Sequence, residues 1–502
     1  MKLLTAAQIR EWDQYTIAHE PKSPLQLMER AASACVAWLA SKGWEKRHFH
    51  IFCGKGNNGG DGLAIARMLS ERGINVTVFI LELEKTGSPL FQENFQQLNG
   101  SNVKVHFITS EALFPIIEPQ SIIIDALFGT GLHQPLEGLS ETLVHHINRI
   151  GAAVVSIDLP SGMFADASSK NQTVVRAQYT LTFQVPKQSF MLAENSERLG
   201  KVLLLDICLS ADFYHQAVVQ FNTVESDQIK TLFRYRDPAS HKGHFGHALL
   251  IGGSYGKIGA MVLATAACMR SGCGLATAYI PTCGYAVMQT VVPEAMVHTG
   301  KGIEQLDSIE IEFDKYAAIG IGPGMGTAEI TQAGLLHFLE FSKQKMVLDA
   351  DALNIISNNK EIISRLPHHT ILTPHPKEFD RLFGDQQNEW ERIQTAMMQA
   401  KALQMIIILK GHRSLIALPD GRGYFNQTGN AGLAKGGSGD VLTGMITAFL
   451  AQGYTQEQAA LLGVYLHGLA ADEAIRSIAE ESLLASDVIA SISQAFKLIK
   501  MS

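Results

Sequence analysis

Short apolar runs alternate with longer amphipathic stretches along most of the chain. This alternation predicts strands followed by helices, the pattern of parallel α/β sheets. Two of the runs, 122–124 and 153–155, are apolar on both faces, which favours strands buried inside a sheet covered on both sides. In the first half we expect a helix at 63–72 and strands at 48–53, 75–81, 103–108, 121–126, 152–157, 179–185 and 201–205.

The alternation lapses between about 206 and 246 and then resumes. The lapse includes a basic, turn-rich stretch at 233–246 without periodicity, and 502 residues exceed what one hydrophobic core usually serves. We place the junction near 211–226 and predict two domains, 1–215 and 226–502. In the second we expect a helix at 259–270 and strands at 247–251, 316–321, 346–348, 370–372 and 405–409.

Composition narrows the class of protein. A hydrophobic content of 46% with 18% charged residues is that of an ordinary globular protein. The net charge of −7 argues against nucleic acid or an anionic membrane as the main partner. The six cysteines include no C-x-x-C pair, so we expect free thiols in a reducing compartment. Thr5–Gln8 is a capping box and not part of a signal peptide, and no apolar run is long enough to span a bilayer, so we expect a cytoplasmic protein.

Three loops in the first half follow predicted strands and are rich in glycine and polar residues. Gly54–Gly62 satisfies G-x-G-x-x-G between a strand and a helix, with Glu82 where a ribose-binding acid would fall. Asp125–Leu132 and Asp158–Gly162 follow two further strands. The carboxyl ends of parallel strands meet at one edge of a sheet, so these loops should converge in one crevice. Their oxygen atoms suit a hard cation, the candidates being Asn57, Asn58, Asp61, Asp125, Asp158 and Ser161.

The second half carries a phosphate-type loop near its end. Residues 429–439 contain five glycines and lead to Asp440 and the apolar run Val441–Leu450, which predicts a helix. Backbone amides at such a helix start attract anions, and an acid on the first turn is placed to take a proton from a hydroxyl that attacks a phosphate. Further strand ends with polar residues are Gly320–Gly326, Asp349–Leu353, Leu372–Phe379 with His375, and Lys410–Ser414.

Each motif also has a simpler structural interpretation. The glycine loops are tight turns, Asp125 forms an Asx-turn, Ser161 and Asp440 cap helices, and His375 is a packed loop histidine. We interpret the other histidines of note as surface residues: His145, His146, His368 and His369.

Motifs along nearly the whole chain resemble those of the bifunctional NAD(P)H-hydrate repair enzymes. In the first half these are Leu27–Ala31, Gly56–Gly62, Asp125–Gly131 and Asp158–Gly162; in the second they are His241–Gly246, Gly322–Gly326, Asp349–Leu353, Thr373–Glu378 and Gly436–Leu442. The resemblance implies an α/β protein with an N-terminal Rossmann-like three-layer epimerase domain, followed by a ribokinase-like α/β dehydratase domain.

What the resemblance implies for function is metabolite repair. The epimerase would interconvert the R and S forms of hydrated NADH and NADPH, and the dehydratase would restore NAD(P)H from the S form at the expense of ADP or ATP with Mg²⁺. Asp158 and Asp440 would be catalytic. Substrate would contact Asn57, Asn58, Gly59, Gly60, Asp61, Gly129, Thr130, Gly131, Leu132, His133, Gln134, Pro135 and Asp158 in the first domain, and Ala260, Gly324, His375 and Asp440 in the second. The adenine nucleotide would contact Lys410, Gly411, His412, Arg413, Ser414 and Gly439, and a potassium ion would bind Asn58, Asp125 and Ser161.

Two positions depart from the family pattern, and two rival functions stay open. Ser414 replaces a common threonine and keeps its hydroxyl, whereas Lys435 replaces an expected threonine and adds a charge beside the phosphate site. One rival is a ribokinase-like kinase for a vitamin precursor or sugar, fused to a dinucleotide-binding regulatory module. The other makes the first half a non-catalytic binding module. The resemblance favours ADP as donor and a homo-oligomer, a tetramer or larger.

Overall fold

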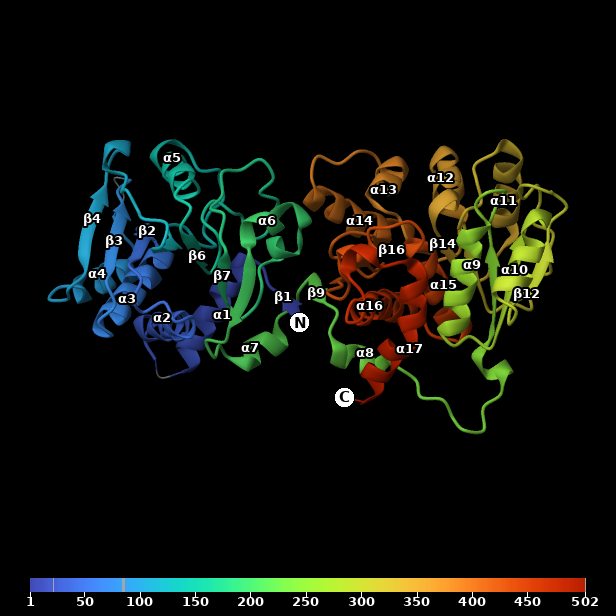
Figure 1. Ribbon diagram of the computed structural model, residues 1–502, viewed down its shortest axis with the longest axis horizontal. Coiled ribbons are helices and arrows are strands. Elements are labelled where there is room, and N and C mark those ends of the chain that lie inside the picture. The colour runs from blue at the N-terminus through green and yellow to red at the C-terminus, as the bar shows by residue number, and fades with distance from the viewer. Residues whose placement is uncertain (21, 84–85, 502) are drawn as a thin grey trace. The chain divides into compact units, whose positions relative to one another are not determined.

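The computed structural model describes residues 1–20, 22–83 and 86–501 (Figure 1). The chain folds into two compact units. The N-terminal unit comprises residues 2–219 with 388–390, and the C-terminal unit comprises residues 220–387 and the chain from 391 onward, with Met1. Within the described ranges, no helix is long and apolar enough to cross a membrane.

The N-terminal unit is built on a fully parallel sheet. The strands of the unit are β1 (Lys2–Leu3), β2 (Phe49–Cys53), β3 (Val76–Leu81), β4 (Lys104–Ile108), β5 (Ile122–Ala126), β6 (Ala153–Ile157), β7 (Tyr179–Phe183) and β8 (Lys201–Leu205). Seven of them form the sheet in the order β4-β3-β2-β5-β6-β7-β8, and every neighbouring pair is parallel. The order reverses between β2 and β5, which is the point where open α/β sheets bind ligands.

Helices cover both faces of this sheet, which explains strands that are apolar on both sides. The helices are α1 (Ala6–His19), α2 (Pro24–Ala40), α3 (Asn57–Glu71), α4 (Pro89–Gln97), α5 (Gly138–Ile147), α6 (Ser196–Leu199) and α7 (Ala211–Gln216). One hydrophobic core joins β2 and β5 to α2 and α3, and a second joins the opposite face to α5. Every residue of β2 and β5 is therefore buried. The three layers agree with the predicted Rossmann-like architecture.

The C-terminal unit has a longer, mixed sheet. Its strands are β9 (Phe221–Thr223), β10 (His247–Ile251), β11 (Leu275–Ile280), β12 (Met296–Thr299), β13 (Ala318–Ile321), β14 (Met346–Leu348), β15 (Ile371–Leu372), β16 (Ile406–Leu409), β17 (Leu415–Ala417) and β18 (Gly423–Phe425). They are ordered β9-β18-β17-β16-β15-β14-β13-β10-β11-β12. The pairs from β12 to β16 are parallel, whereas β17 pairs antiparallel with both its neighbours.

Helices pack against this sheet, and one of them, α15, follows the glycine-rich loop directly. The helices are α8 (Ser226–Leu232), α9 (Ile258–Arg270), α10 (Tyr285–Val291), α11 (Glu329–Phe341), α12 (Ala350–Asn358), α13 (Pro376–Phe383), α14 (Glu389–Leu403), α15 (Ser438–Ala451), α16 (Gln456–Ala474) and α17 (Ala485–Met501). Helix α15 is buried throughout Val441–Ala451, and Gly444 lies so close to α9 that a Cβ there would be 2.0 Å from the Ala264 carbonyl oxygen.

Helix α15 begins earlier than the apolar run predicts. The run starts at Val441, but the helix starts at Ser438 because Gly437, in the left-handed region with φ of 95°, turns the chain into it. Asp440 therefore lies on the first turn, where the predicted phosphate chemistry requires an acid.

Candidate functional site

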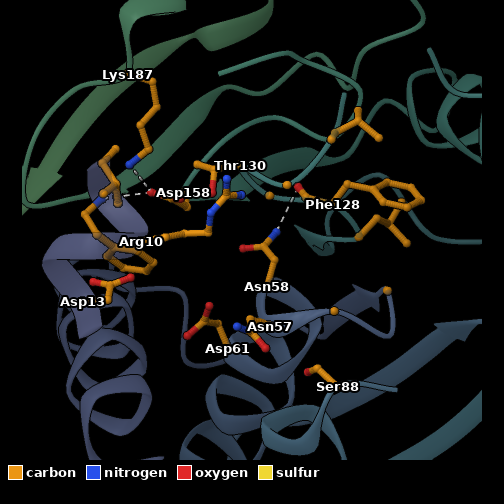
Figure 2. A pocket seen from close by; sticks show the side chains of 18 of the residues that line it. Arg10, Asp13, Asn57, Asn58, Asp61, Ser88, Phe128, Thr130, Asp158 and Lys187 are labelled. Carbon is orange, nitrogen blue, oxygen red and sulfur yellow. Dashed lines mark hydrogen bonds and ion pairs between the residues drawn. The ribbon is translucent and has the colours of Figure 1, made fainter. Parts of the chain in front are cut away.

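A cavity of about 720 Å³ lies at the switch point of the N-terminal sheet (Figure 2). Its walls are the loop Gly54–Asn58 after β2, the loop Leu127–Leu132 after β5, and Asp158 after β6. The two loops touch: a Cβ at Gly54 would lie 2.0 Å from the Leu127 carbonyl oxygen, so only glycine fits there. The predicted convergence of strand-end loops is therefore what the structure shows.

The predicted substrate residues divide into lining and supporting positions. Asn57, Asn58 and Asp61 line the cavity, whereas Gly59 and Gly60 are buried in the first turns of α3. Within the predicted stretch 129–135, the cavity lining includes Gly129 through Leu132, and the last three residues are exposed outside it.

Asp158 is held in a strained and specific position. Its φ of 63° is unusual for a residue with a side chain and marks backbone strain of the kind found at ligand sites. Its Oδ1 accepts from Lys187 Nζ at 2.6 Å, and from Thr182 Oγ1 and the Phe183 amide at 3.2 Å each. Lys187 is 1% exposed, so the lysine side of this ion pair is shielded from water. In the described residues Oδ2 has no hydrogen-bond partner, which leaves one oxygen for chemistry.

The three predicted cation ligands come together beside the cavity. Asp125 is fully buried; its Oδ1 accepts from Ser161 Oγ at 2.5 Å, and its Oδ2 accepts from the Ser161 amide at 2.8 Å and from Ser156 Oγ at 2.7 Å. Ser161 Oγ also accepts from the Phe128 amide, and Asn58 Nδ2 donates to the Phe128 carbonyl oxygen at 3.1 Å. Burial raises the pKa of Asp125 although its hydrogen bonds with Ser161 lower it.

Two further carboxyl groups face the cavity. Asp61 on α3 has a pKa well above its ordinary value because of burial, followed by the charges of Asp158 and Asp13. Asp13 on α1 has its pKa raised to about 7 by burial and by Asp158, with Lys187 opposing. Figure 2 shows Asp13, Asp61 and Asp158 around one space. The site therefore combines one lysine-paired carboxylate with two carboxyls that hold their protons more tightly than usual.

In the C-terminal unit, a buried ionic network lies under the start of α15. Asp349, at the end of β14, accepts from Lys410 Nζ at 2.7 Å and from Thr443 Oγ1 at 2.7 Å. Asp349 is 1% exposed, and Lys410 stands at the end of β16. A Cβ at Gly439 would lie 3.3 Å from Lys410 Nζ, so the glycine loop closes directly over this pair. Burial lowers the pKa of Lys410, but Asp349 and Glu378 more than offset this and raise it.

Asp440 lies beside this network without an ion-pair partner in the described part of the chain. Burial, and then the charge of Asp349, raise its pKa to about 7, although Lys410 acts in the opposite direction. A carboxyl with this pKa is well matched to accept a proton at neutral pH.

His375 caps α13 at the same end of the sheet. Its Nδ1 accepts from the amides of Lys377 at 3.1 Å and Glu378 at 3.3 Å, so its proton is on Nε2, 3.3 Å from Glu378 Oε1. Burial, Lys410 and Arg381 lower the pKa of His375, which keeps the ring neutral.

The other predicted residues of this unit gather at two places. Gly324 lies against the first turn of α9, where a Cβ would be 3.0 Å from Ala260 Cβ. Of the predicted nucleotide segment 410–414, Lys410 points inward to Asp349, while Gly411 and His412 are exposed and Ser414 Oγ accepts from the Gly411 amide at 3.4 Å. Lys435, the unexpected cation, is exposed and donates to the Glu481 carbonyl oxygen. In the N-terminal unit, Glu82, the predicted ribose-binding acid, pairs with Lys55 of the loop Gly54–Asn58.

Sequence reasoning missed several residues of both sites. Asp13 and Lys187 belong to no glycine motif and reach the cavity from distant segments. Thr443 lies within an apolar helix pattern and was not predicted. Its spacing of three residues from Asp440 could have indicated that it faces the same site, because residues three apart share a helix face.

Comparisons with known proteins match both units. A family model described as NAD(P)H-hydrate dehydratase matches residues 248–494, and one described as YjeF-related protein N-terminus matches residues 24–189. The bifunctional NAD(P)H-hydrate repair enzyme of Moorella thermoacetica is 32% identical over 514 residues, covering 97% of this chain and 95% of the relative. The chain belongs to the family of bifunctional NAD(P)H-hydrate repair enzymes.

Solved structures resemble the dehydratase part of this family member. A ribokinase-like superfamily protein from Enterococcus faecalis is 27% identical, with a TM-score of 0.50, and covers 56% of this chain and 98% of its own. The ADP/ATP-dependent NAD(P)H-hydrate dehydratase of Bacillus subtilis, co-crystallised with ATP and Mg²⁺, is 34% identical, with a TM-score of 0.49, and covers 55% of this chain and 98% of its own. Apart from residues 388–390, each family model falls within one unit, so we call the N-terminal unit the epimerase unit and the C-terminal unit the dehydratase unit.

Proposed function

We propose that this protein repairs hydrated NADH and NADPH in two steps, using a separate site in each unit. The epimerase unit interconverts the R and S hydrates, and the dehydratase unit converts the S hydrate to NAD(P)H with ADP or ATP. Family membership over nearly the whole chain supports this reading over a small-molecule kinase fused to a regulatory module.

In the epimerase unit the cavity supports binding of a dinucleotide. The backbone amides of Gly54–Asn58 at the start of α3 are suited to the pyrophosphate, because helix N-termini attract anions. Asp158 Oδ2 is then the oxygen that exchanges protons with the hydrate. Lys187 holds the other oxygen, which orients the carboxylate without blocking it.

A potassium ion beside this cavity is the second element of the proposal. Asp125 is a fully buried carboxylate whose contacts are hydroxyl and amide groups of Ser156, Ser161 and Leu127, with no basic side chain among them. A buried charge needs a counter-charge, and the nearby oxygens of Asn58 and Ser161 are hard ligands. These residues fit a monovalent cation that fixes the loop between β5 and the cavity.

In the dehydratase unit, Asp440 is the proposed general base. It takes the proton of the ring hydroxyl while that oxygen attacks the terminal phosphorus of the nucleotide. The amides around Gly439 hold the phosphates at the start of α15. The phosphate ester then leaves as phosphate, and loss of a ring proton restores the double bond. Mg²⁺ would neutralise the nucleotide phosphates.

The observation that carries the proposal is Asp440, an acid with its pKa raised to about 7, on a helix start that closes over the ion pair of Lys410 and Asp349. The test is recovery of the reduced-nicotinamide ultraviolet absorbance from hydrated NADH, with ADP and ATP supplied separately. Recovery that requires nucleotide supports the proposal. A stable phosphorylated product without recovery would instead support the kinase.

The division of labour between the domains is a further part of the proposal. We expect residues 1–215 alone to interconvert the hydrates without nucleotide, and residues 226–502 alone to consume only the S hydrate. A fragment from residue 226 that consumes both hydrates at equal rates would contradict it. ADP as the preferred donor, a cytoplasmic location and a tetramer or larger assembly stay predictions.

A further inference from the structure

Asp13 occupies a position in the epimerase cavity that no sequence motif indicates. It lies on α1 and is part of the cavity lining (Figure 2). Hydrogen bonds to distant segments fix this helix: among them, Trp12 Nε1 donates to the Ser210 carbonyl oxygen at 2.8 Å, and the Ala6 amide donates to Asp166 Oδ2 at 2.8 Å. The neighbour Trp12 is 2% exposed, so the backbone that carries Asp13 is held in place.

The Asp13 carboxyl has no structural task that would explain its burial. In the part of the chain that the structure describes, it has no hydrogen-bond or ion-pair partner. The charged groups around it are Arg10 on its own helix, Asp61 from α3, and the Asp158–Lys187 pair. An unpartnered, partly buried carboxyl is unfavourable for stability, and such groups are typical of functional sites.

Inversion of the hydrate needs two proton-transfer groups. Hydration of an enamine double bond places the hydroxyl on the carbon bonded to the ring nitrogen. When the nitrogen lone pair expels that hydroxyl, an acid must supply a proton so that water leaves and a carbon–nitrogen double bond forms. Water then adds to the opposite face of the same carbon, and a base takes its extra proton. One carboxyl must therefore begin protonated and another ionised.

We propose that Asp13 is the second acid–base residue of the epimerase. It exchanges a proton with the substrate on one face of the reacting carbon, and Asp158 exchanges a proton on the opposite face. The inference rests on the proposed epimerase function. In one direction Asp13 protonates the leaving hydroxyl and Asp158 takes the proton from the entering water. In the reverse direction the two residues exchange roles. For a second turnover in the same direction, Asp13 regains a proton and Asp158 loses one by exchange with solvent.

Asp61 is less suited to this role than Asp13. Its pKa lies well above the ordinary value, with burial as the main cause, so it gives up its proton less readily than an ordinary carboxyl. Asp13, with a pKa of about 7, gives and regains a proton at neutral pH. Asp61 can still donate a hydrogen bond to the substrate, which agrees with its predicted binding role.

The test uses the full-length protein and epimer exchange followed by NMR. Asp13→Asn keeps the shape and removes the acid, so kcat for exchange should fall by roughly 10²–10⁴-fold with little change in KM. The matched control is Glu11→Gln, which removes one carboxylate from an exposed position of the same helix and should leave exchange unchanged. Wild-type exchange should decline above a pH of about 7 as Asp13 loses its proton, and this decline should be absent in the residual activity of Asp13→Asn.

The outcomes separate the two proposals. A wild-type protein that does not exchange the epimers refutes the epimerase function itself. If the wild type exchanges them and Asp13→Asn does so equally fast, or loses dinucleotide binding together with exchange, the acid–base role is refuted. The thermal unfolding transitions of the full-length variant, compared with those of the wild type, report whether the epimerase unit is folded. If Asp13→Asn does not fold, Asp13→Glu decides: slower exchange that keeps the high-pH decline supports the proposal, and loss of the decline overturns it.

Discussion

Both units have a lysine paired with an aspartate at the end of a sheet, but the paired aspartate has a different predicted role in each unit. In the epimerase unit Lys187 pairs at 2.6 Å with Asp158, the predicted catalytic residue itself. In the dehydratase unit Lys410 pairs at 2.7 Å with Asp349, and the predicted catalytic residue, Asp440, lies beside the pair. The position of one lysine thus decides which carboxyl is held in an ion pair.

This difference suits the two reactions. Epimerisation is reversible and needs an oriented carboxylate together with a separate proton donor. Phosphoryl transfer needs a base with high proton affinity near a polyanion. Asp440 has that affinity because burial and Asp349 raise its pKa, and the paired Lys410 compensates only part of the effect. Moving the lysine to Asp440 would weaken the base.

The largest expected effect is on Asp440, the proposed base of the dehydratase. Asp440→Asn removes proton acceptance and keeps the shape, so dehydratase turnover should fall by roughly 10²–10⁴-fold while nucleotide still binds. Asp227→Asn, at a side chain that is 92% exposed in the same unit, is the control and should be silent. Wild-type turnover of S hydrate by Asp440→Asn would remove Asp440 from the mechanism and with it the contrast between the units.

We expect the epimerase unit, but not the dehydratase unit, to depend on a monovalent cation. Asp125→Ala should weaken both ion and dinucleotide binding and reduce epimer exchange by roughly 10–100-fold. Replacing potassium with a bulky organic cation should slow exchange in the wild type. Exchange measured by NMR that is equal in both media and unaffected in Asp125→Ala would show that Asp125 is only a turn residue.

Changing the partner of Lys410 tests the comparison directly. Asp349→Asn removes the largest charge that raises the pKa of Asp440 and frees Lys410 to approach it. The pKa of Asp440 should fall, so the rise of dehydratase activity with pH, expected near 7 in the wild type, should move down by about one pH unit. Asp351→Asn should move this pH profile less, because the charge of Asp351 raises the pKa of Asp440 less than the charge of Asp349 does. An unmoved pH profile in both variants would show that neither charge sets the base.

The smallest expected effect is on stability. The folded-state pKa of Asp440 is raised from 3.8 to about 7, so the folded protein binds this proton more tightly than the unfolded chain, and stability falls as pH rises between these values. Asp440→Asn should therefore be more stable than the wild type at pH ~8, by roughly 1–3 kcal/mol, and similar to it near pH ~4. Thermal denaturation at the two pH values checks this. A difference that is the same at both would show that the ionised carboxyl is not the cause.

Apolar periodicity predicted the strands that carry long runs of large apolar residues, and it missed buried strands that are short or rich in small residues. The strand predicted at 121–126 is β5 (Ile122–Ala126), because an unbroken run of β-branched residues has few alternatives. Strand β11, Leu-Ala-Thr-Ala-Tyr-Ile, was not predicted, since alanine and threonine carry a weak strand signal and only pairing with β10 and β12 stabilises it. The three-residue strands β17 and β18 escaped detection because they are too short for any period.

The sequence by itself determined where the ligand loops lie. Glycines at strand ends act through local backbone freedom, so the loop at Gly54, the loop before Asp440 and the helices they open are readable from residues close in the chain. The partners of the carboxyl groups at those loops were not readable. Asp13 lies near Asp158 although more than a hundred residues separate them, and Lys187 reaches Asp158 from the end of a later strand. Lys410 pairs with Asp349 from a strand two positions away in the sheet. The tertiary structure decided which carboxyl is paired, which is buried and which keeps its proton, because desolvation and Coulomb energies depend on distance in space and not on distance along the chain.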